Sequence, residues 1–238
     1  MGKSHLSEED IKLRYITPAI QNAGWDNKQI RMEYAFTAGR IILRGNITAR
    51  GRKKSADYLL SYKNNFPLAI VEAKDNTQPV GAGLQQATDY AKALDVPYVY
   101  ASNGDGFVEQ NLITGEVKEL KLEEFPSPEA LYQRYRIDKG IDEAEEKVML
   151  EPYYYIPNYK TPRYYQRVAI NRAVDAVAKG QNRVLVVSAT GTGKTYMTFQ
   201  MIYRLWWNGN SFFDKFYKVQ NFFPYAIPIV LDNEPPRM

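Results

Sequence analysis

The feature that most constrains this sequence is a pair of apolar runs on either side of the turn Lys63–Pro67, because ionisable residues stand at their outer ends. The two runs read as the strands of a β-hairpin. Asp57 opens the first strand, whereas Glu72 and Lys74 close the second. Pairing the strands around the turn brings these three side chains together at one end of the hairpin. Unpaired buried charge is costly, so this convergence needs a partner or a function.

The charged end of the hairpin has the composition of a metal site. Two carboxylates one strand apart repel each other unless a cation lies between them, and carboxylate oxygens are ligands that Mg²⁺ prefers. A bound metal ion polarises a phosphodiester and lowers the pKa of its bound water, and Lys74 is placed to orient that water or to neutralise charge in the transition state. We therefore predict a phosphodiester-cleaving site at Asp57, Glu72 and Lys74. The alternative is an exposed hairpin end with a surface ion pair.

The bulk composition fits a globular protein of more than one domain. The 238 residues are 45% hydrophobic and 24% charged, which suits one full domain and part of a second. A tyrosine- and proline-rich linker at 151–162 separates a first domain, 1–150, from a second, 163–238. The net charge of +4 favours polyanionic partners slightly, and the absence of cysteine excludes disulfides and thiolate metal sites. The sequence has no signal peptide and no spanning apolar run, so we expect a cytoplasmic protein without a membrane partner.

The remaining patterns of the first domain predict an α/β fold, in which helices pack on a mixed sheet. Ser7 and the acids after it read as the capped start of a helix over Glu8–Ala23, kinked at Pro18. A second helix is expected over Ala82–Leu94. Further expected elements are strands at Arg40–Leu43, Pro97–Ala101 and Phe107–Ile113, a basic loop at Gly45–Lys54, and an acidic helix at Ile137–Glu151.

The charged hairpin resembles a known nuclease motif. Asp57 together with Glu72-Ala73-Lys74 resembles the PD-(D/E)xK signature, with Ala56 where the weakly specified proline of that motif would stand. The resemblance implies a restriction-endonuclease-like mixed sheet flanked by helices. It also implies that Asp57, Glu72 and Lys74 are catalytic, with Mg²⁺ as the cofactor bound by the two carboxylates.

Two further elements narrow the resemblance to type I restriction subunits. Gln86 and Tyr90 lie one helical turn apart and match the Gln-x-x-x-Tyr element that follows the hairpin in the nuclease domains of those subunits. The first helix, which ends at Gly24-Trp25, is similar to the N-terminal helix of the family, where an acid, here Glu8, borders the metal site. The resemblance therefore adds Gln86 and Tyr90 to the catalytic residues and Glu8 to the metal site. On their own, Gln86 and Tyr90 also fit an ordinary half-buried helix face.

A second signature follows the linker. Val184–Val187 reads as a buried strand and precedes the Gly-rich stretch Ser188–Thr195 and an apolar helix, which is the order of elements in a P-loop. In such a loop the backbone amides wrap the phosphates of ATP, the lysine reaches the terminal phosphates and the hydroxyl residue ligates Mg²⁺. The pattern resembles superfamily 2 helicase motors, whose adenine-reading glutamine would be Gln166. The implied nucleotide-binding residues are Gln166, Gly191, Thr192, Gly193, Lys194 and Thr195.

Only the truncated start of a RecA-like lobe is expected here. Ile229–Asp232 has the shape of a Walker B strand but follows the loop too closely, and the sequence from Trp206 onward does not continue the superfamily pattern. A P-loop strand without neighbours buries too little apolar surface to order itself. We therefore expect weak or no nucleotide binding, with residues after about 163 poorly ordered or packed onto the nuclease domain.

The order of nuclease before motor resembles the N-terminal part of the restriction (R) subunit of a type I enzyme, over residues 7–206. This resemblance implies a Mg²⁺-dependent DNA endonuclease, coupled in the complete protein to ATP-driven translocation. Its partners would be double-stranded DNA and the modification (methyltransferase) and specificity subunits. The alternatives are a catalytically inactive DNA-binding or assembly module and an ATPase acting through the P-loop. The single histidine, His5, lies in the leader, so histidine-based hydrolysis is excluded.

Overall fold

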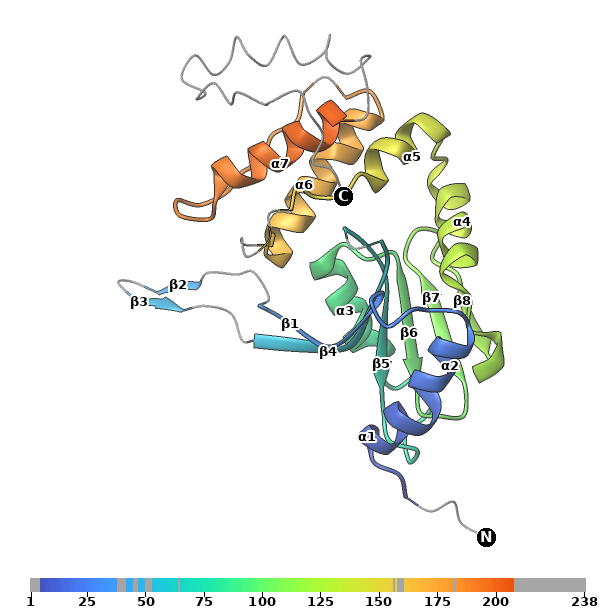
Figure 1. The fold of residues 1–238 in the computed structure, drawn as a ribbon. Coiled ribbons are helices and arrows are strands. Elements are labelled where there is room, and N and C mark those ends of the chain that lie inside the picture. The colour runs from blue at the N-terminus through green and yellow to red at the C-terminus, as the bar shows by residue number, and fades with distance from the viewer. Residues whose placement is uncertain are drawn as a thin grey trace, which may run out of the picture.

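A computed structural model of the chain describes residues 5–37, 42–44, 47–49, 53–63, 65–155, 157, 161–181 and 183–207. Its centre is a six-stranded sheet with the strand order β1-β4-β5-β6-β7-β8 (Figure 1). These strands are β1 (Ile30–Thr37), β4 (Lys53–Lys63), β5 (Phe66–Ala73), β6 (Tyr98–Ser102), β7 (Phe107–Asn111) and β8 (Val117–Leu120). The mixed α/β class is therefore confirmed, although the sequence patterns predict neither β1 nor β8.

The charged hairpin has the expected form. β4 and β5 run antiparallel, with Tyr58 opposite Val71 and Leu60 opposite Ala69. β5 and β6 run parallel to each other, because helix α3 (Leu84–Leu94) forms the crossover between them. Together these two pairings place the end of β5 in the middle of the sheet, next to the helix that follows it.

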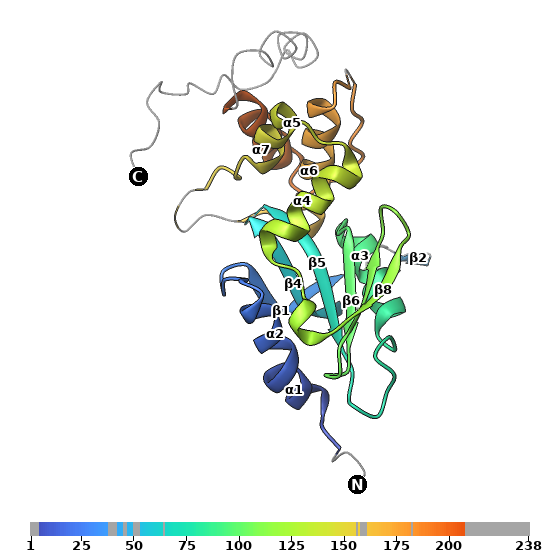
Figure 2. The same cartoon turned by 90° about the vertical axis from the view of Figure 1, so that its right-hand side faces the viewer.

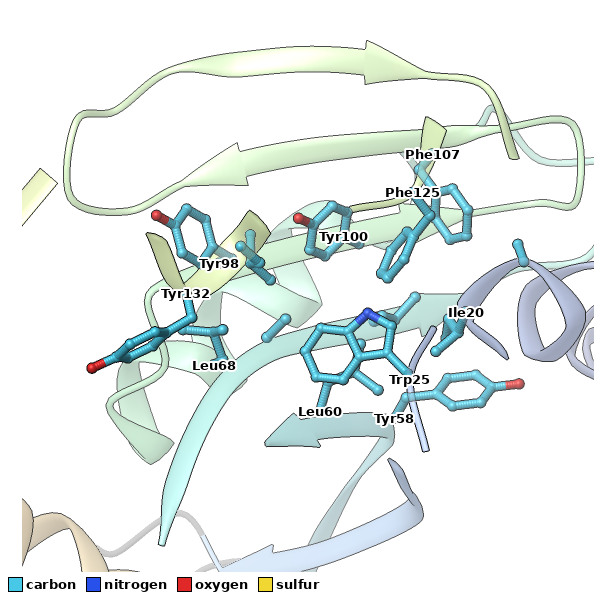
Figure 3. Packing of buried hydrophobic residues seen from close by; sticks show 14 of the residues in the cluster. Ile20, Trp25, Tyr58, Leu60, Leu68, Tyr98, Tyr100, Phe107, Phe125 and Tyr132 are labelled. Atoms are coloured by element: carbon cyan, nitrogen blue, oxygen red, sulfur yellow. The ribbon is translucent and has the colours of Figure 1, made fainter. Parts of the chain in front are cut away.

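Helices cover the sheet on both faces (Figures 1 and 2). Along β4 the side chains alternate: Tyr58 and Leu60 belong to one core, and Leu59 between them belongs to the other. The larger core is closed by the N-terminal helix and by α4 (Pro128–Lys139), and Figure 3 shows its aromatic rings. The smaller core lies under α3. Burial of each large apolar side chain stabilises the fold by about 1.5–3 kcal/mol.

The N-terminal helix is continuous but changes its winding. It consists of α1 (Glu8–Ile11), the π-helical turn η1 (Lys12–Ile16) and α2 (Thr17–Asn22), and Ser7 caps it by accepting from the N–H of Asp10 at 3.2 Å. Pro18 has no N–H, and its ring would clash with a carbonyl of the preceding turn. A wide π turn precedes Pro18, and such turns are frequent at functional sites. The kink expected at Pro18 stays a prediction.

The acidic segment Ile137–Glu151 is helical as expected, but it is divided between two helices. α4 ends at Gly140, whose φ of 63° is a left-handed conformation that favours glycine, and α5 (Glu143–Leu150) follows. α4 begins earlier than expected because Pro128 occupies its first turn, where a missing N–H costs nothing.

The two C-terminal helices pack on each other, and the first of them also packs on α5 and α3. α6 (Tyr164–Ala178) and α7 (Lys194–Trp207) enclose a third cluster with α5, built on Val148, Ile170 and Leu205. Asn171 Nδ2 donates to the carbonyl of Asn65 at 2.9 Å, which ties α6 to the turn of the hairpin. This agrees with the expectation that residues after about 163 pack onto the first domain.

The expected buried strand Val184–Val187 is wrong. The described residues of this stretch form no strand, and Leu185 and Val187 are 88% and 87% exposed. No other strand of the described chain lies beside it, so its backbone has no ladder to join.

Some expectations fall outside the described residues. These are Arg40 and Ile41 of the strand expected at Arg40–Leu43, part of the basic loop including Arg50 and Arg52, and everything after residue 207, including Ile229–Asp232. The described part of this region forms a small sheet of β2 (Ile42–Arg44) and β3 (Ile47–Ala49). Among the described helices, none is long and apolar enough to cross a membrane.

Candidate active site at the end of the hairpin

The structure brings Asp57 and Glu72 together at the end of the hairpin, where both are buried at 9% and 3% exposure. Each lies one residue beyond the paired Tyr58 and Val71. The backbone N–H of Ala73 donates to Asp57 Oδ2 at 2.8 Å, which holds the carboxylate against the Glu72-Ala73-Lys74 segment. The burial excludes the alternative of an exposed ion pair at the hairpin end.

Glu72 receives its support from α3. Gln86 Nε2 donates to Glu72 Oε1 and lies 3.1 Å from the hydroxyl of Tyr90. The other oxygen, Oε2, is buried without a hydrogen-bond partner. Burial, together with the nearby charge of Asp57, raises the pKa of Glu72 to about 8, although Lys74 opposes part of this shift.

Lys74 lies between two carboxylates at the rim of the site. Its ammonium is 3.4 Å from Glu8 Oε1 and 3.8 Å from Glu72 Oε1. The predicted residue Glu8 is thus next to Lys74, and its side chain is half-exposed at 45%. The structure therefore assembles Glu8, Asp57, Glu72 and Lys74 in one place from two distant segments of the chain.

Lys12 is a residue of this site that the sequence patterns do not predict. It lies in the π-helical turn, is only 3% exposed, and places its ammonium 3.2 Å from Asp57 Oδ1. Burial alone would lower the pKa of Lys12, but hydrogen bonds to Glu33 and Glu9 and the charge of Asp57 raise that pKa above its usual value. Lys12 is therefore a cation in contact with the first carboxylate of the motif.

The pair Asp57 and Glu72 fits a divalent cation. Glu72 Oε2 is a buried oxygen without a partner, and Asp57 keeps free lone pairs beside the bonds to Ala73 and Lys12. A cation there would also favour the ionised form of Glu72. No group of three or more His, Asp or Glu side chains in the described chain is arranged to hold a metal ion. Glu8 as a further ligand therefore stays a prediction.

The predicted nucleotide-binding residues also lie together, at the start of α7. Gln166 Nε2 donates to the carbonyl of Thr192 at 2.8 Å, and Gly193 lies so close to Gln166 that an added Cβ would be 2.6 Å from Nε2. The Lys194 ammonium is 3.3 Å from the carbonyl of Ser188. Gly191 and Thr195 flank these contacts in sequence. The polar groups of the loop are therefore bonded to one another and to Gln166.

The family model described as "Type I restriction enzyme R protein N terminus (HSDR_N)" matches residues 7–126, which is half of the chain and includes the whole hairpin site. The chain belongs to this family. A second family model, described as "Type III restriction enzyme, res subunit", matches residues 159–219. This second match extends past Trp206, where the sequence patterns alone indicated that the resemblance ends.

Relatives of this R-protein N terminus are endonuclease subunits. The chain is 48% identical over 216 residues to the type I restriction enzyme EcoAI endonuclease subunit of Escherichia coli, covering 89% of this chain and 27% of the relative. It is 24% identical to the EcoKI endonuclease subunit of Escherichia coli strain K12, covering 84% of this chain and 21% of the relative. The chain thus spans about a quarter of the length of these curated relatives.

A solved structure supports the same assignment. It is the fragment structure of a putative HsdR subunit of a type I restriction enzyme from Vibrio vulnificus YJ016, with a TM-score of 0.75 and 42% identity. The similarity covers 87% of this chain and 39% of that chain. The mixed sheet and its helices are thus the fold of an R-subunit N terminus.

Proposed function

We propose that this chain carries the DNA-cleaving site of a type I restriction endonuclease subunit, a PD-(D/E)xK nuclease site built from Asp57, Glu72 and Lys74. The observation that carries the proposal is the burial of Asp57 and Glu72 side by side, with Glu72 Oε2 left without a partner. A purely structural hairpin would not require two adjacent buried carboxylates, since each costs desolvation energy.

Each residue of the site has a distinct role in the proposal. Asp57 and Glu72 hold Mg²⁺, which supplies Lewis-acid polarisation of the phosphodiester and a more acidic water when bound. Lys74, whose ammonium is free to turn between Glu8 and Glu72, donates to the attacking water or to a phosphate oxygen. Gln86 keeps Glu72 in place through Oε1, and Tyr90 supports Gln86.

Double-stranded DNA is the proposed substrate. Lys54, at the start of β4, lies with its ammonium 5.2 Å from the centre of the Tyr90 ring, so a basic side chain stands next to the helix that borders the site. Such a position suits a contact to a DNA phosphate. In the complete protein we propose that a superfamily 2 motor, which begins at the P-loop, couples cleavage to ATP-driven translocation. The proposed assembly includes modification and specificity subunits.

Mn²⁺ titration of the 238-residue chain tests the metal site directly. We expect one bound Mn²⁺ per chain in the wild type and loss of binding in Asp57→Asn and Glu72→Gln, which keep shape but remove charge. Glu119→Gln, on the exposed edge strand β8, is the matched control and should bind as the wild type does.

DNA cleavage by a complex reconstituted with the full-length subunit is the second measurement. Asp57→Asn, Glu72→Gln and Lys74→Ala should each abolish cleavage and leave ATP hydrolysis intact. Absence of Mn²⁺ binding in the wild type, with cleavage unaffected by Asp57→Asn, would favour a catalytically inactive DNA-binding or assembly module instead.

A further inference from the structure

Lys12 is enclosed by three carboxylates that come from three different elements. Its ammonium is 2.5 Å from Glu9 Oε1 in α1, 2.8 Å from Glu33 Oε1 in β1 and 3.2 Å from Asp57 Oδ1 in β4. An ammonium has three donors, so each donor has one carboxylate partner. The side chain of Lys12 is only 4% exposed, whereas those of Glu9 and Glu33 are 79% and 59% exposed.

The backbone holds Lys12 in this position. The carbonyl of Lys12 accepts from the N–H of Thr17 in the π turn and from the hydroxyl of Tyr58 at 3.3 Å. Glu33 has a φ of 49°, a left-handed conformation that is strained for a side chain with a Cβ. Strain of this kind persists only where surrounding contacts fix the residue, and here the ion pair with Lys12 is such a contact.

The Lys12 ammonium contacts only one of the two carboxylates at this end of the hairpin. Asp57 contacts Lys12 through Oδ1 and the backbone of Ala73 through Oδ2, whereas among the described residues no hydrogen bond or ion pair joins Glu72 to Lys12. The ammonium therefore neutralises the side of Asp57 that faces Glu9 and Glu33. The other oxygen, Oδ2, accepts from the N–H of the residue after Glu72 and keeps a lone pair for a divalent cation.

We propose that Lys12 is a positioning residue that occupies the place of a second divalent cation, so that the nuclease site binds a single metal ion. The inference rests on the proposed nuclease function, since it assigns the first cation to Asp57 and Glu72. The three carboxylates stand at distances suited to an ammonium, longer than the roughly 2.1 Å of a Mg²⁺–oxygen bond. Because Glu9 and Glu33 are mostly exposed, they are free to move inward once the ammonium is removed.

Counting bound Mn²⁺ in the 238-residue chain tests this inference. Lys12→Met removes the charge and keeps the length of the side chain, so it should bind one more Mn²⁺ per chain than the wild type. Lys12→Arg keeps a cation and should bind the wild-type number. Lys28→Met, at an exposed lysine of the same domain, is the control and should also bind the wild-type number.

A second substitution separates the added site from the first. The double variant Lys12→Met with Glu33→Gln should return to the wild-type number, because one carboxylate of the vacated site is lost. Glu33→Gln alone should also bind the wild-type number, since Glu33 contacts the ammonium. Loss of Mn²⁺ in Glu33→Gln alone would overturn the inference, and this arm stays informative if Lys12→Met does not fold.

The outcomes distinguish the inference from the proposed function. An unchanged or lower Mn²⁺ number in folded Lys12→Met, or two ions in the wild type, would overturn the role of Lys12. Zero ions in the wild type with one in Lys12→Met would support that role and count against the Mg²⁺ site at Asp57 and Glu72. A merely structural Lys12 would lower the melting temperature in Lys12→Met without adding an ion.

Discussion

The backbone N–H of Ala73 donates a 2.8 Å hydrogen bond to Oδ2 of Asp57, across the two strands of the hairpin. Ala73 is the central residue of Glu72-Ala73-Lys74, so this bond fixes the first carboxylate of the motif against the segment that carries the other two groups. A hydrogen bond from a backbone N–H to a carboxylate contributes about 1.5–3 kcal/mol. The sheet itself thus fixes the position of Asp57 relative to Glu72 and Lys74. Substitutions that displace the Glu72 side chain should therefore weaken metal binding at the site.

Gly83→Ala should disturb the site without breaking the fold. Gly83 precedes α3, and a Cβ there would lie 3.1 Å from Glu72 Cγ and 3.5 Å from Lys74 Cε. Its φ of −83° suits any residue, so the added methyl group displaces Glu72 rather than straining the backbone. We expect at least about tenfold weaker Mn²⁺ binding, or about 1.4 kcal/mol, with little change in melting temperature. Gly81→Ala, whose Cβ would make only an ordinary 3.5 Å contact with Val108, should bind as the wild type does.

Gln86→Ala and Tyr90→Phe should reduce cleavage more than metal affinity. Gln86 orients Glu72 through Oε1 and leaves Oε2 open, and one such hydrogen bond contributes about 0.5–1.5 kcal/mol. Mn²⁺ affinity should therefore change by less than about tenfold. Cleavage by the reconstituted complex should fall further, because a carboxylate without its support is misplaced. Tyr90→Phe keeps the ring against Phe36 at 5.1 Å and tests the hydroxyl alone. Equal losses of Mn²⁺ binding and cleavage in Gln86→Ala would contradict this separation.

The hairpin and its neighbours could be predicted because their sequence carries the signal locally. The residues from Tyr58 to Leu60 and from Phe66 to Val71 are apolar on both faces, which is typical of central strands. β1 lacks that signal: of its eight residues only Phe36 is buried, and charged residues interrupt the apolar pattern. β8 is a short edge strand with exposed and half-buried positions alternating, so it resembles a loop in sequence.

Lys12 could not be predicted for a different reason. A lysine in the first turns of an amphipathic helix ordinarily lies in solvent, and Glu9 three residues earlier reads as a common surface pair. Its burial depends on Glu33 and Asp57, which reach it from two strands. Lys12 lies in a π turn just before Pro18, and no local sequence pattern predicts that winding.

Metal-free stability should fall as pH rises from about 4.5 to about 8. The pKa of Glu72 is about 8 in the folded chain, because of burial and the charge of Asp57, against 4.5 in the unfolded chain. Within that window the folded state binds the extra proton, so raising the pH favours unfolding, by a few kcal/mol at most over the whole range. Chemical denaturation at several pH values measures the slope, and Glu72→Gln should remove it.

The same shift predicts how metal binding depends on pH. Mn²⁺ competes with the proton on Glu72, so its affinity should rise about tenfold per pH unit below 8 and level off above that value. Lys74, Asp57 and Tyr90 also face this carboxylate, but Asp57 is the carboxylate whose charge contributes most to raising the pKa. Titrations from pH 6 to pH 8 measure the dependence. A pH-independent affinity would show that Glu72 is already ionised in the metal-free protein.

The P-loop in this chain should bind ATP weakly or not at all, with no turnover. Its own groups fill the loop: Gln166 is bonded to the carbonyl of Thr192, and the Lys194 ammonium turns back to the carbonyls of Ser188 and Ala189 at 3.3 and 3.4 Å. The segment before the loop is exposed and unpaired with any described strand, so nothing holds the amides open toward a phosphate. Calorimetric titration with ATP and Mg²⁺ should give a Kd weaker than about 1 mM, and Lys194→Ala should behave as the wild type does.

A longer chain that supplies neighbouring strands should gain affinity for ATP. Micromolar binding to the 238-residue chain that is lost in Lys194→Ala would instead mean that the loop rearranges around the nucleotide without the rest of the motor.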